Sequence, residues 1–367
     1  LLLALLTGFA IAAVPQLPRL IVLLHGMPVT IPHEVSVLMI VSSLLLLPLA
    51  LVLGTSIPLA WQMVRDDSAH AAGHAGRVLA FNTLGGLLGS LLAGFVLVPA
   101  IGVERALYLV IGLHALLASL ALALSGTRLP RRVFGALVPV LAVLCIVALR
   151  PSLQLAWLLD AWHDGNATAV SGPERGEPCQ NGTCDGEAVC IEGHCNDTVR
   201  FMREGRNTTV TLLTRDGSSY RLFNDGRPES GFSPGNPGFG SELALLGALP
   251  SLLAATPERA MAIGFGGGHT TTMLLAGPFQ RVDVVELEEA VIDAARIMHA
   301  NFDKPFPLDD ERVHPTFDDA RAQLLLAPAG TYDAVVSQPS HPWLAGSSAL
   351  YTEEFFREVQ HSLRPGG

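Results

Sequence analysis

A glycine-rich turn between two short apolar runs constrains the fold of this chain more than any other feature. Residues 262–270 read Ala-Ile-Gly-Phe-Gly-Gly-Gly-His-Thr, and residues 282–288 read Val-Asp-Val-Val-Glu-Leu-Glu. This order predicts a strand, a turn, a helix and a second strand that ends in an acidic residue. Such a unit is typical of the alternating α/β folds that bind ligands at the carboxyl ends of their strands.

Three glycines and one glutamate of this unit predict the kind of ligand. Glycine lets the backbone approach a ligand closely and leaves the N-terminus of the following helix open. The three glycines are Gly264, Gly266 and Gly268. Glu286 follows the first of them by about 20 residues, the spacing at which such folds place a carboxylate on ribose hydroxyls. We therefore expect a nucleoside-containing ligand.

The alternation of strands and helices continues to the end of the chain. The patterns predict strands at 261–265, 281–286, 313–318 and 332–337, and helices at 269–275, 289–301, 320–326 and 352–363. The last helix is amphipathic, and its expected inner face consists of Phe355, Phe356, Val359 and Leu363. Four segments should then meet at one rim of the sheet, namely Gly264–His269, Glu286, Asp318–Asp319 and Ser337–His341.

A small antiparallel β unit and a helix precede this pattern. Residues 208–214 are rich in β-formers, Asp216-Gly217 is a hairpin turn signal, and residues 220–223 form the expected return strand. Asn224-Asp-Gly226 marks a second turn, and an apolar helix is expected at 242–255.

The first 150 residues differ in composition from the rest. The chain is 50% hydrophobic and 15% charged, whereas soluble proteins carry about a quarter charged residues. The deficit lies in this part, where runs long enough to cross a bilayer, about 20 residues, occur at 1–24, 35–61, 78–101, 106–124 and 133–149. We expect a multi-pass membrane domain attached to the lipid bilayer, with buried helices of a soluble protein as the alternative.

The arginines of the loops predict the orientation of these spans. Arg65 and Arg77 follow the second span, and Arg128, Arg131 and Arg132 follow the fourth. The opposite side has Arg105, with Arg19 and Arg150 near helix ends. Because cytoplasmic loops carry the excess of basic residues, the part after the fifth span should lie outside the cytoplasm.

The charge balance and the chain ends give two further expectations. The net charge is −10, Lys304 is the only lysine, and there is no basic stripe, so nucleic acid is not an expected partner. The chain begins with Leu inside an apolar run and stops at a Pro-Gly-Gly turn. We therefore expect truncation at both ends.

Four cysteines lie in a glycine-rich stretch with few core-forming residues: Cys179, Cys184, Cys190 and Cys195. Two disulfides or one tetrahedral zinc would order such a stretch. The gaps between them hold four, five and four residues, without the short pair that zinc sites favour. Disulfides are the favoured interpretation, with His194 keeping the zinc alternative open, and no metal is expected at the nucleoside site. Cys145 lies in the fifth span and is interpreted as an apolar packing residue.

The predicted fold class is a multi-pass α-helical membrane domain followed by an α/β Rossmann-like domain of the class I methyltransferase type. The expected domains are a helical domain at 1–150, a cysteine-rich linker at 151–198, a β-hairpin unit at 199–235 and the Rossmann-like domain at 236–367.

The motifs from residue 199 to the end resemble the spermidine synthase (polyamine aminopropyltransferase) family in order and spacing. They include Ile-Gly-Phe-Gly-Gly-Gly, Val-Glu-Leu-Glu, Phe-Asp-Asp-Ala-Arg, Tyr-Asp-Ala-Val-Val-Ser-Gln-Pro-Ser-His-Pro-Trp, Leu-Tyr-Thr-Glu-Glu-Phe-Phe and Leu-Arg-Pro-Gly-Gly. The Pro-Ser-His-Pro-Trp-Leu-Ala-Gly segment is closer to a membrane-fused branch, in which such a domain follows a transporter-like helical region. Residues 54–101 are similar to that region.

The resemblance implies roles for the nucleoside-side residues. Gly264, Gly266 and Gly268 would cradle the amino-acid-derived end of decarboxylated S-adenosylmethionine or S-adenosylmethionine, and Glu286 would hold the ribose hydroxyls. Asp319, beside Asp318, would accept from the adenine amino group, with Ala320 next to the ring. The alternative for both aspartates is a solvated helix N-cap.

The amine side departs from the family pattern. The family has aspartates where His269, Ser337 and His341 stand here, and these carboxylates hold and deprotonate the amine. His269 and His341 are interpreted either as bases, which requires neutral rings, or as polar rim residues. The remaining amine-side candidates are Tyr351, Glu242, Gln338 and Trp343, the last as an aromatic wall for a cation or as a packing residue.

Three functions follow from this pattern. The first is aminopropyl transfer from decarboxylated S-adenosylmethionine to a small amine or polyamine by a membrane-anchored transferase. The second is S-adenosylmethionine-dependent methyl transfer on the same scaffold. The third is a non-catalytic polyamine or nucleoside sensor or transporter accessory. Relatives in the family often form homodimers, so a homodimer is also an expectation.

Overall fold

The chain divides into two compact units, Leu1–Gly176 and Glu177–Gly367. The computed structural model describes residues 2–13, 33–63, 71–124, 189–191, 194–196, 198–214, 217–233, 241–302, 304–337 and 346–367. The division between the units falls inside the predicted linker at 151–198.

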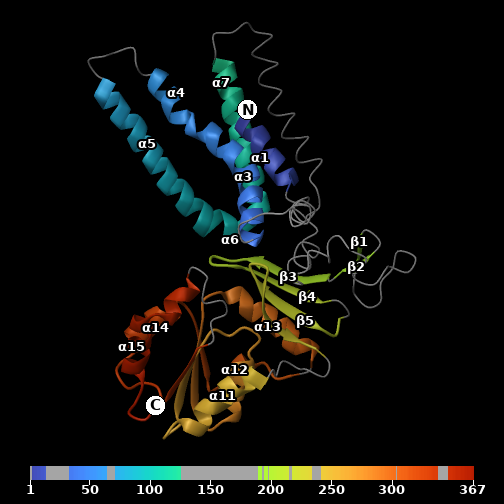
Figure 1. Ribbon diagram of the computed structural model, residues 1–367, viewed down its shortest axis with the longest axis vertical. Helices are drawn as coiled ribbons and strands as arrows, with labels where there is room; N and C mark the ends of the chain where they lie inside the picture. The colour runs from blue at the N-terminus through green and yellow to red at the C-terminus, as the bar shows by residue number, and fades with distance from the viewer. Residues whose placement is uncertain are drawn as a thin grey trace. The chain divides into compact units, whose positions relative to one another are not determined.

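The described part of the first unit is built from apolar helices (Figure 1). They are α1 (Leu2–Ala13), α3 (His33–Gly54), α4 (Ser56–Met63), α5 (Ala71–Leu92), α6 (Val98–Ile101) and α7 (Val103–Leu124). A π-helical turn, η2 (Ala93–Leu97), joins α5 to α6. Pro99 follows this turn and has no N–H to donate to the preceding one, which accounts for the wider turn. Gly102, with φ of 82°, ends α6.

Two stretches of this unit are long and apolar enough to cross a membrane by length and composition. Met39–Gln62 has 24 residues and a mean hydropathy of 2.3, and Ala75–Ile101 has 27 residues and a mean hydropathy of 2.1. Only 6% and 0% of their most apolar windows are buried, unlike the core helix of a soluble protein. They coincide with the predicted spans 35–61 and 78–101.

The other three predicted spans have less support. Helix α1 has 12 residues, which reach about 18 Å, whereas the hydrocarbon core is about 30 Å thick. The apolar stretch of α7, Arg105–Ala121, is also shorter than a spanning helix. The span predicted at 133–149 lies outside the described residues, and so does Cys145. The described residues thus give two candidate spans where the sequence predicts five, and the multi-pass domain stays a prediction.

The second unit begins with a short antiparallel pair, β1 (Val189–Ile191) and β2 (His194–Asn196). The pairing places Cys190 opposite Cys195. No disulfide is found among the described residues, and the side chains of these two cysteines, together with Cys179 and Cys184, lie outside them. The predicted disulfides therefore stay a prediction.

A four-stranded antiparallel sheet follows, where the sequence predicts only a hairpin. Its strands, in the order β3-β4-β5-β6, are β3 (Thr198–Glu204), β4 (Thr209–Thr214), β5 (Tyr220–Asn224) and β6 (Arg227–Phe232). The predicted turn between β5 and β6 is present, with Asp225 and Gly226 at φ of 49° and 73°. Strand β6 escapes prediction because it contains Pro228, which a sheet tolerates at an edge strand.

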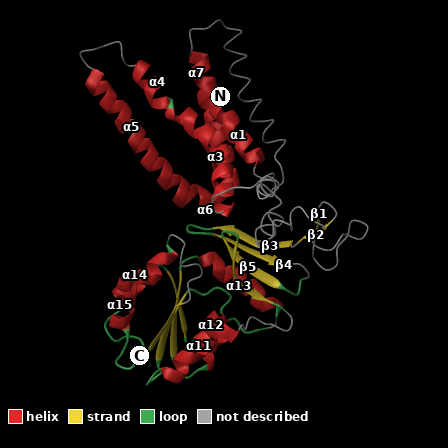
Figure 2. Cartoon of the chain, viewed as in Figure 1, coloured by secondary structure: helices red, strands yellow, loops and turns green. Residues whose placement is uncertain are grey.

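The C-terminal part is a parallel sheet with helices on both faces (Figures 1 and 2). The strand order is β10-β7-β8-β9, with β7 (Arg259–Ile263), β8 (Arg281–Glu286), β9 (Val313–Phe317) and β10 (Ala334–Ser337). The helices are α11 (Ser241–Leu253), α12 (His269–Ala276), α13 (Glu289–Asn301), α14 (Ala320–Leu326) and α15 (Glu353–Ser362), with short helices η3 (Pro307–Asp309) and η4 (Ser347–Tyr351). The predicted α/β alternation is confirmed.

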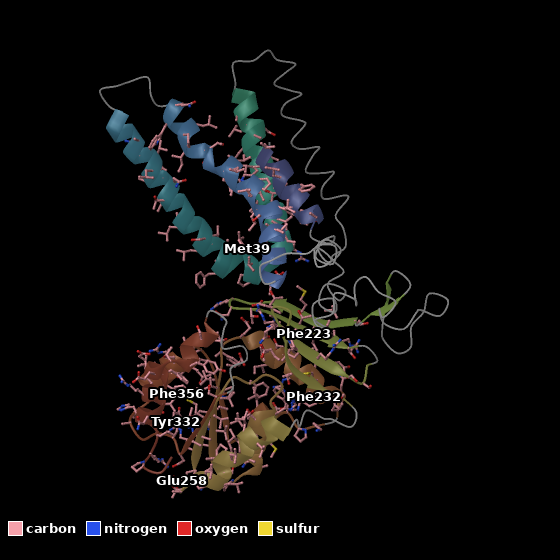
Figure 3. All side chains as sticks on the ribbon, viewed as in Figure 1. Met39, Phe223, Phe232, Glu258, Tyr332 and Phe356 are labelled. Atoms are coloured by element: carbon pink, nitrogen blue, oxygen red, sulfur yellow. The ribbon has the colours of Figure 1, made fainter. Side chains whose placement is uncertain are left out.

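Alternate residues of each strand serve two different cores, as the period of two requires. In β7, Ala260 and Ala262 join a core that includes α12, α13 and the antiparallel sheet, with Phe232 among its buried members (Figure 3). Met261 and Ile263 join the core on the other face, beneath α14 and α15. The antiparallel sheet therefore shares one core with the parallel sheet.

One face assignment in the last helix is wrong. Phe355 is 1% exposed, and Val359 and Leu363 pack against the same core, but Phe356 is 57% exposed (Figure 3). Residue 356 follows the buried position by one, about 100° around the helix, and so it lies outside the i, i+4 stripe.

A buried carboxylate, that of Asp333, connects several segments at the amino ends of the parallel strands. Asp333 is 3% exposed and accepts hydrogen bonds from the backbone N–H groups of Glu258 at 3.1 Å and Arg259 at 2.8 Å. Its two oxygens also face Arg364 Nη1 at 3.1 Å. The start of β10 is thereby tied to the start of β7 and to the turn after α15.

Candidate functional site

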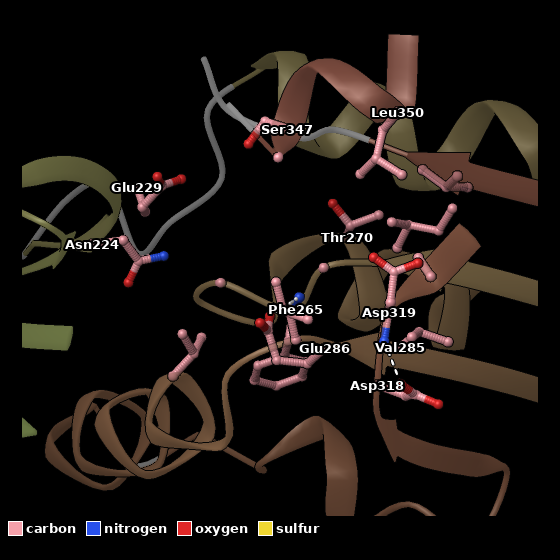
Figure 4. A pocket seen from close by; sticks show the side chains of 18 of the residues that line it. Asn224, Glu229, Phe265, Thr270, Val285, Glu286, Asp318, Asp319, Ser347 and Leu350 are labelled. Carbon is pink, nitrogen blue, oxygen red and sulfur yellow. Dashed lines mark hydrogen bonds between the residues drawn. The ribbon is translucent and has the colours of Figure 1, made fainter. Parts of the chain in front are cut away.

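A cavity of about 340 Å³ opens at the carboxyl ends of β7, β8 and β9 (Figure 4). Parallel strands end at the same edge of their sheet, so the turns that follow them meet there. The structure brings together three of the four predicted segments: Gly264–His269, Glu286 and Asp318–Asp319. The antiparallel sheet and η4 complete the wall.

The glycine turn is built from backbone conformations that favour glycine. Gly264, Gly266 and Gly268 have φ of 82°, 53° and 79°, in the left-handed region where L side chains are disfavoured. A Cβ on Gly268 would lie 2.8 Å from Cζ of Phe265. Gly268 is the N-cap of α12, and no side chain caps that helix. Gly264 and Gly266 line the cavity, whereas Gly268 lies behind them.

Glu286 joins the ends of two strands through its carboxylate. Oε2 accepts the backbone N–H of Phe265 at 2.8 Å, and Oε1 accepts the backbone N–H of Glu288 at 3.0 Å. Burial raises the pKa of this carboxyl, and the backbone N–H donors around it oppose the rise. The backbone N–H groups of Leu287 and Gly266 are also donors to this carboxylate, and Glu286 lines the cavity.

Asp318 and Asp319 line the cavity and also cap the next helix. Asp319 Oδ1 accepts the backbone N–H of Ala322 at 2.9 Å and so caps α14. Asp318 accepts the N–H of Asp319 at 2.8 Å and Nε2 of Gln323 at 2.8 Å. The capping alternative is thus present in the structure, and the adenine role of Asp319 stays a prediction. Ala320, 8% exposed, lies next to them in the wall.

The antiparallel sheet contributes a wall that the sequence did not predict. Asn224 and Glu229 face the cavity from the side opposite the aspartates (Figure 4). Ser230 lies beside them, against Gly267, where a Cβ would collide with its Oγ. The signal for this wall was weak because Pro228 hid β6, the strand that carries Glu229 and Ser230.

His269 lies at the base of the cavity in a buried position. It is 5% exposed, its ring packs 4.5 Å from that of Phe232, and it hydrogen-bonds the backbone of Gly231. Burial, followed by the charges of His299 and Lys304, lowers its pKa from 6.5 to about 4. The ring is therefore neutral near pH 7. A group with that pKa is a weak base at neutral pH, so the geometry favours a structural role over proton transfer.

Of the other predicted site residues, the structure describes the side chains of Ser337 and Tyr351, and neither lines this cavity. Ser337 lines a different cavity of about 470 Å³, between α11 and β10, whereas its neighbour Val336 reaches the nucleoside side. Tyr351 is 44% exposed at the end of η4 and does not line the wall. Glu242 lies in the first turn of α11, and its side chain lies outside the described residues. Three further candidates lie outside them altogether: Gln338, His341 and Trp343.

The fold and the cavity define a Rossmann-type domain with a nucleoside-sized site at the carboxyl edge of its sheet. Residues 242–367 match the family described as the spermine/spermidine synthase domain. This part of the chain is therefore similar to a spermine/spermidine synthase domain.

Similar proteins carry two names. Putrescine N-methyltransferase 1 of Nicotiana tabacum is 31% identical over 161 residues, which is 42% of this chain and 38% of that protein. Spermidine synthase 2 of Arabidopsis thaliana is 32% identical over 120 residues, which is 32% of this chain and 34% of that protein. The chain thus spans between a third and two fifths of the length of these relatives.

Among solved structures, a spermidine synthase in complex with the transition state analogue AdoDATO is similar at 18% identity. The likeness covers 45% of this chain and 55% of that one, with a TM-score of 0.39.

The buried state of His269 predicts a loss of stability in acid. Between pH 6.5 and about 4 the unfolded chain binds a proton at this ring and the folded chain does not, so the free energy of unfolding falls as the pH falls. His269→Gln should flatten this dependence by on the order of 2–3 kcal/mol between pH 7 and 4.5, measured by denaturant unfolding of the full chain. The exposed His314→Gln is the control, and an unchanged pH slope in His269→Gln would contradict the assignment.

Proposed function

We propose that this domain transfers an aminopropyl group from decarboxylated S-adenosylmethionine to a small amine. The observation that supports this most is the charge of the cavity wall. It contains four carboxylates, Glu229, Glu286, Asp318 and Asp319, and one arginine, Arg321. That arginine is held by Glu358 at 3.0 Å, so the wall favours cations. The donor is a sulfonium with an ammonium group, and the acceptor is an amine.

Different residues of the wall are proposed to contact different parts of the donor. Glu286 accepts hydrogen bonds from the ribose hydroxyls, because its oxygens face the cavity while backbone N–H groups hold them in place. Asp319 accepts from the adenine amino group with the oxygen that does not cap α14, and Ala320 lies beside the ring. The glycine turn receives the sulfonium side, where the absence of side chains on Gly264 and Gly266 leaves room for close approach.

Transfer requires a neutral amine near the carbon that leaves the sulfur. The amine lone pair forms the new C–N bond, the C–S bond breaks, and its electrons leave with methylthioadenosine. The amine must lose one proton in all. His269 is a poor acceptor for it because its pKa is about 4, so His341 stays the candidate base and His269 is proposed to shape the floor of the site. Ser337 lines the other cavity and is not proposed to act.

A second candidate is methyl transfer from S-adenosylmethionine to an amine. This donor carries a carboxylate that the decarboxylated form lacks. The N-terminus of α12 at the glycine turn has no side-chain cap, and His269 there is neutral. A helix N-terminus attracts a carboxylate. The relatives named putrescine N-methyltransferase favour this candidate as well.

A product assay on the full chain separates these functions. The protein is supplied with a polyamine mixture and either donor, and the products are read by mass spectrometry. Methylthioadenosine and a polyamine lengthened by an aminopropyl group are expected with the decarboxylated donor. S-adenosylhomocysteine and a methylated amine would replace the proposal with methyl transfer. No nucleoside product from either donor would reject both transferases and favour the sensor or transporter accessory.

We further propose that the domain is anchored to a membrane by the five predicted spans, two of which coincide with Met39–Gln62 and Ala75–Ile101, and that it lies outside the cytoplasm. The length and hydropathy of these stretches and the arginine bias of the loops support this. A reporter that is active only in the cytoplasm, fused after residue 367, should be inactive, while the same reporter fused between the two spans should be active. Activity at the end of the chain would contradict the orientation, and recovery of the chain in the soluble fraction would contradict the anchoring.

A further inference from the structure

His299 lies directly behind the glycine turn, on the side away from the cavity. It belongs to α13, it is 4% exposed, and its side chain does not line the cavity. Its ring is packed edge-on against two aromatic rings, Phe232 at 5.1 Å and Phe306 at 5.2 Å. These contacts on two sides fix the plane of the imidazole and the direction in which its nitrogens point.

Both ring nitrogens meet backbone carbonyls. Nε2 lies 2.9 Å from the oxygen of Gly267, and Nδ1 lies 3.1 Å from the oxygen of Pro305. Burial lowers the pKa of His299, although the two carbonyls oppose the change. A neutral ring has one N–H, and we assign it to Nε2, which makes the shorter contact, to the oxygen of Gly267.

This hydrogen bond completes the support of one peptide group. The peptide that joins Gly267 to Gly268 has its carbonyl held by His299 and its N–H donated to the oxygen of Phe265 at 2.8 Å. The peptide is thus held at both ends, between two glycines with positive φ, Gly266 and Gly268. Glycine loses more conformational freedom on ordering than any other residue. The two hydrogen bonds on this peptide offset part of that cost.

From these contacts we infer that His299 is a positioning residue for the nucleoside site. It holds the carbonyl of Gly267 away from the cavity and so keeps the turn in the shape that admits the sulfonium side of the donor. The role rests on the proposed nucleoside binding and adds to it a residue that touches no substrate. Gly267 is the point of action, and Ser230 and His269 lie so near it that a side chain at this position would collide with both.

Three substitutions separate the hydrogen bond from simple packing. The amide nitrogen of Gln lies as many bonds from the backbone as Nε2 of His, whereas the amide nitrogen of Asn corresponds to Nδ1. His299→Gln therefore keeps the donor to Gly267, His299→Asn moves it to the side of Pro305, and His299→Leu removes it. His361→Leu, at an exposed position of α15, is the control.

The first measurement is the affinity of the full chain for 5′-methylthioadenosine, by calorimetry. His299→Leu and His299→Asn should each bind about tenfold more weakly than the unsubstituted chain, the effect of one hydrogen bond, while His299→Gln should stay within about threefold. Equal weakening in all three variants would mean packing alone and would overturn the inference. If the unsubstituted chain binds no nucleoside, the proposed function fails. Whether His299 positions the glycine turn is then tested by the second measurement, which uses no ligand.

The second measurement needs no ligand. Amide hydrogen exchange of a peptide covering 264–272 should be faster in His299→Leu and His299→Asn than in the unsubstituted chain, and it should return to the original rate in His299→Gln. Exchange at 210–214, in a strand of the antiparallel sheet, reports general loosening and should not change in the Asn variant. Equal exchange of the turn in Asn and Gln variants would overturn the positioning role.

Discussion

The site depends on the carboxylate of Glu286 and the two backbone N–H groups that it accepts. One N–H belongs to Phe265, in the turn after β7, and the other to Glu288, after β8. One side chain thereby joins the ends of β7 and β8, two parallel strands that lead into separate turns. A carboxylate held in this way has a fixed orientation before any ligand binds, and preorganisation of this kind is what makes polar contacts effective.

The second constraint is that the wall of the site comes from two sheets with one core. Phe232 of the antiparallel sheet packs against His269 of α12 and His299 of α13. Both histidines have lowered pKa values because of burial. The glycine turn therefore lies between two buried histidines on one side and the carboxylate of Glu286, which accepts the N–H of Phe265, on the other.

Much of this arrangement could be predicted from the sequence, because local patterns determine it. The strands and helices from residue 259 onward follow from hydrophobic periodicity, and the cavity-lining positions of Gly264, Glu286 and Asp319 follow from the rule that parallel strands end at one edge. What could not be predicted depends on tertiary contacts. Glu229 reaches the cavity only because β6 crosses the glycine turn, and Pro228 hid that strand.

The properties of the two histidines also depend on tertiary contacts and so could not be predicted from the sequence. The position of His269 was predicted, but its low pKa comes from burial, to which Phe232 contributes, and then from the charges of His299 and Lys304. These three residues are far from His269 in the sequence. His299 gave no signal, since a histidine on an amphipathic helix is common. Ser337 ends the predicted strand, yet the strand alternation directs Val336 rather than Ser337 to the nucleoside cavity.

The affinity of the full chain for 5′-methylthioadenosine, with and without Glu286→Gln, tests the central claim most directly. The amide keeps the volume of the carboxylate but replaces one acceptor with a donor that faces a backbone N–H. We expect binding to weaken about tenfold or more, as for hydrogen bonds to a charged group, with no change in Glu311→Gln, at an exposed position. Equal affinity in Glu286→Gln and the unsubstituted chain would contradict a nucleoside site organised by this carboxylate.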